Sequence, residues 1–187
     1  MAKRVANTFV LVEDVAQQNL VRQYLERVRG RDFNDHKIRW EPLLSGRGSG
    51  EQHVRKQYAK LVKTLRSKLG KGVSTILIVM IDADKGSTDD RHRQLARSLS
   101  DANVQERNAD EPIVVLVPKR HVETWIQALL GNDVDESADY KRSNPTSQDF
   151  KNAAATLYDW TRENARPHEN CPPSLSAAIG EWKKIPL

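Results

Sequence analysis

Two acidic motifs each follow a strongly apolar segment of this sequence. Glu13 closes the apolar run 8–12, and Asp82 and Asp84 close the run 73–81. In an extended chain alternate side chains point the same way, so Asp82 and Asp84 can present their carboxylates to one side. Crowded carboxylates repel one another unless a cation lies between them, and Mg²⁺ favours such hard oxygen ligands. A metal held there could activate water and neutralise charge on a phosphodiester.

The segments that must position these acids alternate between strand and helix patterns. Runs rich in branched apolar residues predict four strands, at 8–12, 36–40, 73–81 and 113–117. Helical periodicity predicts six helices, one ending near Gly30 and the others at about 51–69, 89–99, 121–130, 148–164 and 174–182. The alternation predicts an α/β fold, with a mostly parallel four-stranded sheet, helices on both faces and further C-terminal helices. We expect a single Rossmann-like domain over 1–187, with a core over about 5–130 and a helical extension over about 148–187.

The carboxyl ends of parallel strands are where ligands gather in such sheets. If the first and third strands are neighbours, Glu13 and Asp82 meet at that edge. The alternative is that acids after a strand cap the next helix, as Asp89 or Asp90 could do.

Further charged residues follow the fourth strand at the same edge. Lys119 and Arg120 could stabilise a phosphate, with His121 as a further candidate, and Glu123 could support the acidic group. The alternative for Glu123 is a first-turn acid favoured by the helix dipole.

The net charge of +5 favours a polyanionic partner, because bound Lys and Arg release counterions from phosphates. Lys56, Lys60 and Lys63 lie at helical spacing and could follow a phosphate backbone, or they could form a solvated helix face. Arg47 lies in the glycine-rich loop 46–50, which is either a phosphate-binding nest or a flexible loop.

Composition excludes several classes of protein. The longest apolar run is too short to cross a bilayer. Cys171 is the single cysteine, so no internal disulfide can form, and we expect a cytoplasmic protein.

The acidic motifs and their order resemble the TOPRIM (topoisomerase–primase) domain. Phe9-Val10-Leu11-Val12-Glu13-Asp14 and Ile76-Leu77-Ile78-Val79-Met80-Ile81-Asp82-Ala83-Asp84 carry that resemblance, over about two-thirds of the chain. The glycine-rich loop and Glu123-Thr124-Trp125 resemble segments of small TOPRIM-like proteins. Those proteins are associated with ABC-type ATPases of the overcoming-lysogenization-defect (OLD) kind.

The resemblance implies Mg²⁺ or Mn²⁺ held by Glu13, Asp82 and Asp84, with Glu123 at a second metal or in an outer shell. It also implies cleavage of nucleic acid, with DNA favoured over RNA, and a separate ABC-type ATPase as partner in antiviral defence. The alternative is a TOPRIM-like subunit that docks on an ATPase or nucleic acid without cutting it.

Overall fold

The computed structural model describes residues 7–44 and 49–185. The strands are β1 (Asn7–Leu11), β2 (Ile38–Trp40), β3 (Thr75–Met80) and β4 (Ile113–Leu116). The α-helices are α1 (Val15–Arg29), α2 (Gly50–Gly70), α3 (Thr88–Asp101), α4 (Val122–Leu129), α5 (Ser147–Thr161) and α6 (Pro173–Trp182). No helix in these ranges is long and apolar enough to cross a membrane.

The four strands form one parallel sheet in the order β2-β1-β3-β4. Leu11 of β1 pairs with Val79 of β3, and Val79 pairs with Val115 of β4. The predicted α/β fold is therefore confirmed. The sheet order also confirms that the strands before Glu13 and Asp82 are neighbours.

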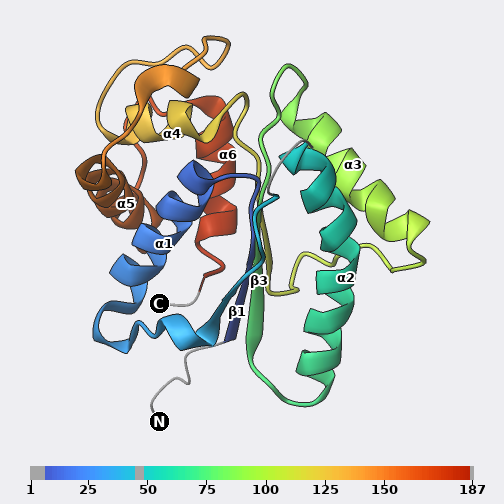
Figure 1. The fold of residues 1–187 in the computed structure, drawn as a ribbon. Helices are drawn as coiled ribbons and strands as arrows, with labels where there is room; N and C mark the ends of the chain where they lie inside the picture. The colour runs from blue at the N-terminus through green and yellow to red at the C-terminus, as the bar shows by residue number, and fades with distance from the viewer. Residues whose placement is uncertain (1–6, 45–48, 186–187) are drawn as a thin grey trace.

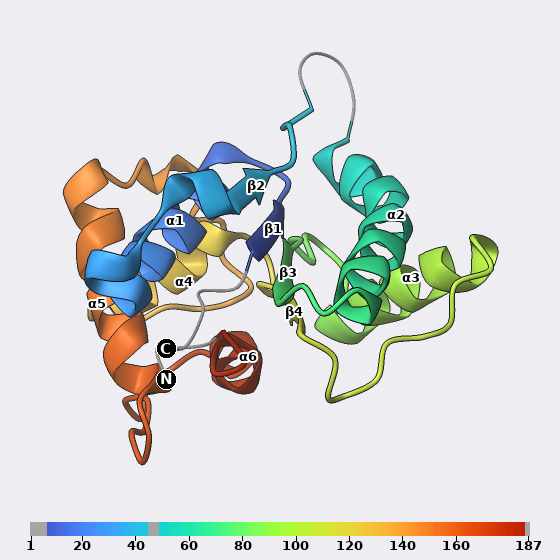
Figure 2. The same cartoon turned by 90° about the horizontal axis from the view of Figure 1, so that it is seen from below.

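Helices cover both faces of the sheet, with α1, α4, α5 and α6 on one face and α2 and α3 on the other (Figures 1 and 2). Side chains alternate along each strand, so the strands contribute to a hydrophobic core on each face of the sheet. Ile76 and Ile78 belong to the first core, on the side of α1, and Leu77 and Val79 belong to the second core, on the side of α2. Burying each such side chain contributes about 1.5–3 kcal/mol. The predicted C-terminal extension belongs to the first core, through residues such as Leu157.

Local hydrogen bonds shift two predicted boundaries. The strand expected over 36–40 begins only at Ile38, because Asp35–Lys37 forms a 3-10 turn capped by the Asn34 side chain. The helix expected to reach Asn164 ends at Thr161. Asn164 itself has a φ of 61°, in the left-handed region that ends helices.

The open edge of β4 is covered by side chains rather than by another strand. Arg107 donates to the carbonyl of Ile113 at 2.8 Å, and Glu181 of α6 accepts from the N–H of Val115 at 2.9 Å. Arg107 and Glu181 also pair with each other at 3.0 Å. This pair fills hydrogen-bonding positions that an added strand would use.

Candidate active site at the carboxyl edge of the sheet

Glu13 and Asp82 meet at the carboxyl ends of β1 and β3. The Glu13 carboxylate accepts a hydrogen bond of 2.5 Å from the backbone N–H of Asp82. Asp82 is only 4% exposed, whereas Glu13 is partly buried. Helix α2 begins beside them, since a Cβ atom on Gly50 would lie 3.0 Å from the Glu13 carbonyl oxygen. A larger residue at position 50 would therefore require α2 or the Glu13 backbone to shift by a few tenths of an ångström.

Gln17, which the sequence reading did not select, holds both acids in place. It is fully buried in the first turn of α1, where its side-chain amide donates to the Asp82 carboxylate at 2.8 Å. Its carbonyl oxygen accepts from the Glu13 backbone N–H at 2.9 Å. Gln17 itself is fixed because its backbone N–H donates to Asp14, the N-cap of α1.

Asp84 lies on a tight turn after β3 and has a left-handed backbone, with φ of 52°. Its backbone N–H donates to the carbonyl of Arg120 at 3.2 Å, which ties this turn to the segment after β4. Its carboxylate lies 3.3 Å from Arg91 of α3 and is about half exposed. Asp84 is therefore the most accessible of the three predicted acids.

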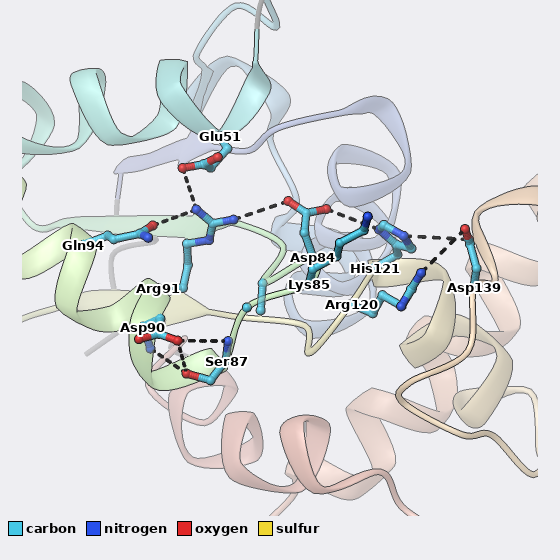
Figure 3. Close-up of a pocket in the computed structure, with 12 residues that line it drawn as sticks. Glu51, Asp84, Lys85, Ser87, Asp90, Arg91, Gln94, Arg120, His121 and Asp139 are labelled. Carbon is cyan, nitrogen blue, oxygen red and sulfur yellow. Dashed lines mark hydrogen bonds and ion pairs between the residues drawn. The ribbon is translucent and has the colours of Figure 1, made fainter.

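Arg91 is a buried cation that connects three elements at this site. Its guanidinium donates to the Asp82 carbonyl at 2.8 Å and pairs with Asp84. It also pairs with Glu51 in the first turn of α2, at 2.5 Å, and donates to Gln94 at 2.7 Å (Figure 3). The sequence reading selected neither Arg91 nor Glu51.

His121 lies between two of the predicted acids. Its Nδ1 is 3.6 Å from Asp82. The same nitrogen is 3.8 Å from Asp84, and its Nε2 is 3.8 Å from Asp139 (Figure 3). The interaction with the Asp82 carboxylate raises the pKa of His121. A protonated His121 thus places positive charge where Asp82 and Asp84 converge.

The acids resist ionisation at this edge. Burial, and then the nearby charge of Asp82, raise the pKa of Glu13 to about 8. Burial also raises the pKa of Asp82 and the pKa of Glu123. A divalent cation would oppose these effects, because it favours the charged form of each carboxylate.

Glu123 lies in the first turn of α4 and is 5% exposed. Its Oε2 is buried and makes no hydrogen bond with the part of the chain that the structure describes. The ammonium of Lys141 lies 2.8 Å from Asp14, and its positive charge partly opposes the rise in the pKa of Glu123 that burial causes. The environment of Glu123 therefore combines an unsatisfied oxygen with a cation that the sequence reading did not select.

The two predicted cations after β4 are engaged within the protein. Lys119 donates to the carbonyl of Gly86 at 2.8 Å, and Arg120 donates to the carbonyl of Ser137 at 2.9 Å. Arg120 also lines an open pocket of about 580 Å³, together with His121, Asp84, Lys85 and Arg91 (Figure 3). This pocket is large enough for a phosphodiester group, and both acidic and basic side chains line it.

The predicted phosphate-binding residues fall into three groups. Lys56 and Lys60 are exposed on α2, whereas the Lys63 ammonium donates to the carbonyl of Ala102 at 3.1 Å. Arg47 lies outside the described residues.

The acids do not form a ready-made metal site. Within residues 7–44 and 49–185, no three His, Cys, Asp or Glu side chains are arranged to hold a metal ion. The Asp82 N–H and Gln17 bind two of the carboxylates, and Arg91 pairs with Asp84. The donor set nevertheless fits Mg²⁺ or Mn²⁺ chemically, because these ions favour carboxylate oxygens. Binding would require Asp84 to exchange its cation partner for the metal.

The geometry defines an α/β protein whose parallel sheet carries an acidic, partly buried carboxyl edge. Comparison with known protein families, curated proteins and solved structures found no match for this chain. The resemblance to the TOPRIM domain therefore stays a prediction from the sequence.

Proposed function

We propose that this protein binds Mg²⁺ or Mn²⁺ through Glu13, Asp82 and Asp84 and cleaves phosphodiester bonds in nucleic acid. The observation that carries the proposal is the meeting of Glu13 and Asp82 at neighbouring strand ends, where both have raised pKa values. Buried acids of this kind are concentrated at functional sites. The TOPRIM resemblance supports the same reaction class.

Several residues in and beside the pocket have a part in the proposed reaction. The metal, when bound, supplies an activated water molecule and neutralises phosphate charge. Gln17 orients the Asp82 carboxylate, and Arg120 and Lys85 line the pocket where a phosphate would bind. His121 can hold or release a proton at Nδ1, beside Asp82. Glu123 is a buried acid whose charge interacts with Asp82, and it supports the acidic group without contacting the substrate.

The substrate and partners belong to the proposal as well. The net charge of +5 supports a nucleic-acid substrate, with DNA favoured over RNA. The OLD-like features support an ABC-type ATPase as partner in a cytoplasmic defence system.

Cleavage assays with matched acid-to-amide variants test the proposal. Glu13→Gln and Asp82→Asn should each reduce cleavage more than about a hundredfold, because they remove charge that holds the metal. Glu123→Gln should slow cleavage about tenfold to a hundredfold, as outer-shell changes do. Asp110→Asn is the control, since Asp110 is exposed between α3 and β4.

The assay should offer DNA and RNA with Mg²⁺ or Mn²⁺, with and without a candidate ATPase. Cleavage that survives Glu13→Gln would remove the proposed metal site.

The second candidate is a binding subunit that docks on nucleic acid or an ATPase without cutting. The pairing of Asp84 with Arg91 favours it, because that carboxylate already has a cation. Binding by the wild-type protein without cleavage under any of these conditions would establish this alternative.

A further inference from the structure

A second open groove, of about 550 Å³, lies between α2 and α3, which run side by side on one face of the sheet (Figures 1 and 2). From α2 it is lined by Gln52, Arg55, Lys56 and Ala59, which share one helix face because they are three or four residues apart. From α3 it is lined by residues with the same spacing, which include Gln94, Arg97 and Asp101.

The groove joins the pocket of the candidate active site. Gln94 lines both hollows, and its side-chain oxygen accepts from Arg91 at 2.7 Å. On the α2 side, Glu51 lines the pocket and the next residue, Gln52, lines the groove. The two hollows are therefore adjacent and share Gln94 at their boundary.

Positive charge predominates along the groove. Lys56 and Arg97 are exposed, and neither forms an ion pair with the part of the chain that the structure describes. Arg55 pairs with Glu51 at 2.9 Å and remains about one-third exposed. Asp101 is the acid in the lining, and it lies at the far end, next to Ala102, whose carbonyl binds Lys63.

We propose that one strand of nucleic acid lies in the α2–α3 groove, with phosphates at Arg55, Lys56 and Arg97, and enters the acidic pocket past Gln94. The stretch of α2 from Gln52 to Ala59 is about 10 Å long. A nucleic-acid strand advances about 3.4 Å per nucleotide in a duplex. The α2 side of the groove is thus as long as roughly three nucleotides of a duplex strand, and three cations line the groove.

This path differs from a lysine face on α2 alone. Lys56 lines the groove, but Lys60 does not. Arg97, which comes from α3, adds a cation from the other side of the groove. The destination of the strand rests on the proposed function, whereas binding in the groove does not.

The test compares two variants that each remove three positive charges. The groove variant is Arg55→Gln/Lys56→Gln/Arg97→Gln. The control is Lys60→Gln/Lys71→Gln/Lys151→Gln, at exposed positions that line neither hollow. Binding of a fluorescent 20-nucleotide single-stranded DNA is measured by anisotropy in EDTA over a series of salt concentrations.

The groove variant should bind on the order of tenfold to a hundredfold more weakly, and its log–log salt slope should fall by about 2. The control should lose less affinity, since its charges act only through the general field. If the groove variant has a lowered melting temperature, the single variants Lys56→Gln and Arg97→Gln are measured in its place. Each should lower the log–log salt slope by about 0.7.

Wild-type-like binding by the groove variant, an equal loss in the control, or no binding by the wild-type protein would overturn the inference. Because the assay contains no metal and measures no cleavage, these outcomes are independent of the proposed chemistry. Groove-dependent binding without any cleavage would count against the proposed reaction alone.

Discussion

Replacing Glu13 by glutamine tests whether the acidic edge is electrostatically unfavourable without a metal. The substitution keeps the shape of the side chain and leaves a carbonyl oxygen to accept the Asp82 N–H. It removes the Glu13 carboxyl group, whose ionisation is opposed by burial and by the charge of Asp82. We expect Glu13→Gln to stabilise the metal-free protein at alkaline pH.

The magnitude follows from the pKa of Glu13. Its rise from an ordinary value of 4.5 to about 8 makes ionisation in the folded state cost up to about 5 kcal/mol, at 1.4 kcal/mol per tenfold change in proton affinity. Because the pKa of Glu13 is higher in the folded than in the unfolded state, the stability that the protonated carboxyl group provides is fully present below pH 4.5. It is lost as the pH rises through about 8.

The free energy of unfolding of the two proteins should therefore agree near pH 4.5 and diverge steadily above it. At pH 8.5 in EDTA, Glu13→Gln should be more stable by up to about 5 kcal/mol. At this chain length that corresponds to a rise in melting temperature on the order of 10 °C.

Urea unfolding at several pH values measures this difference directly. Adding Mg²⁺ at ten times its dissociation constant should then stabilise the wild-type protein at pH 8.5 by about 1.4 kcal/mol, but not Glu13→Gln. Parallel pH profiles for the two proteins would refute the electrostatic reasoning. Equal stabilisation of both by Mg²⁺ would refute the role of Glu13 as a ligand.

Two predictions concern positioning and stability. Arg91→Gln should cost about 2–4 kcal/mol in urea unfolding, because Glu51, Asp84 and the Asp82 carbonyl lose a shared buried cation, with only Arg55 left to pair with Glu51; a loss below about 1 kcal/mol would show that the network adds little. Glu181→Ala should cost about 2–3 kcal/mol, because the Val115 N–H and Arg107 lose a shared acceptor. It should also promote association through the exposed β4 edge, measurable by light scattering, and unchanged monomers would contradict that role.

The sheet and the meeting of Glu13 with Asp82 could be predicted because both depend on patterns that are local in the sequence. Apolar runs mark the strands, and the parallel arrangement places their carboxyl ends at one edge. Only the neighbour relation of β1 and β3 had to be assumed, and the sheet order confirms it.

The residues that hold the acids could not be predicted in this way. Gln17 and Asp82 are 65 positions apart, so no short spacing reveals their hydrogen bond. Arg91 stands among charged residues on α3, where such residues usually face solvent, yet it is buried. The sequence alone could not show that Arg97 and Lys56 line the same groove, because the groove exists only where α2 and α3 lie side by side.

The choice between enzyme and binding subunit depends on what metal binding would require of Asp84. Asp82 is buried, and Gln17 fixes one of its carboxylate oxygens. The Asp84 carboxylate is half exposed, and the buried Arg91 keeps Glu51 as a partner, so giving up the Asp84–Arg91 ion pair of 3.3 Å costs about 1 kcal/mol. A divalent ion would offset this cost, because it would favour the ionised form of Glu13, which burial and the charge of Asp82 disfavour. The pairing of Asp84 with Arg91 is therefore a weaker argument for the binding subunit than the buried acids are for the enzyme.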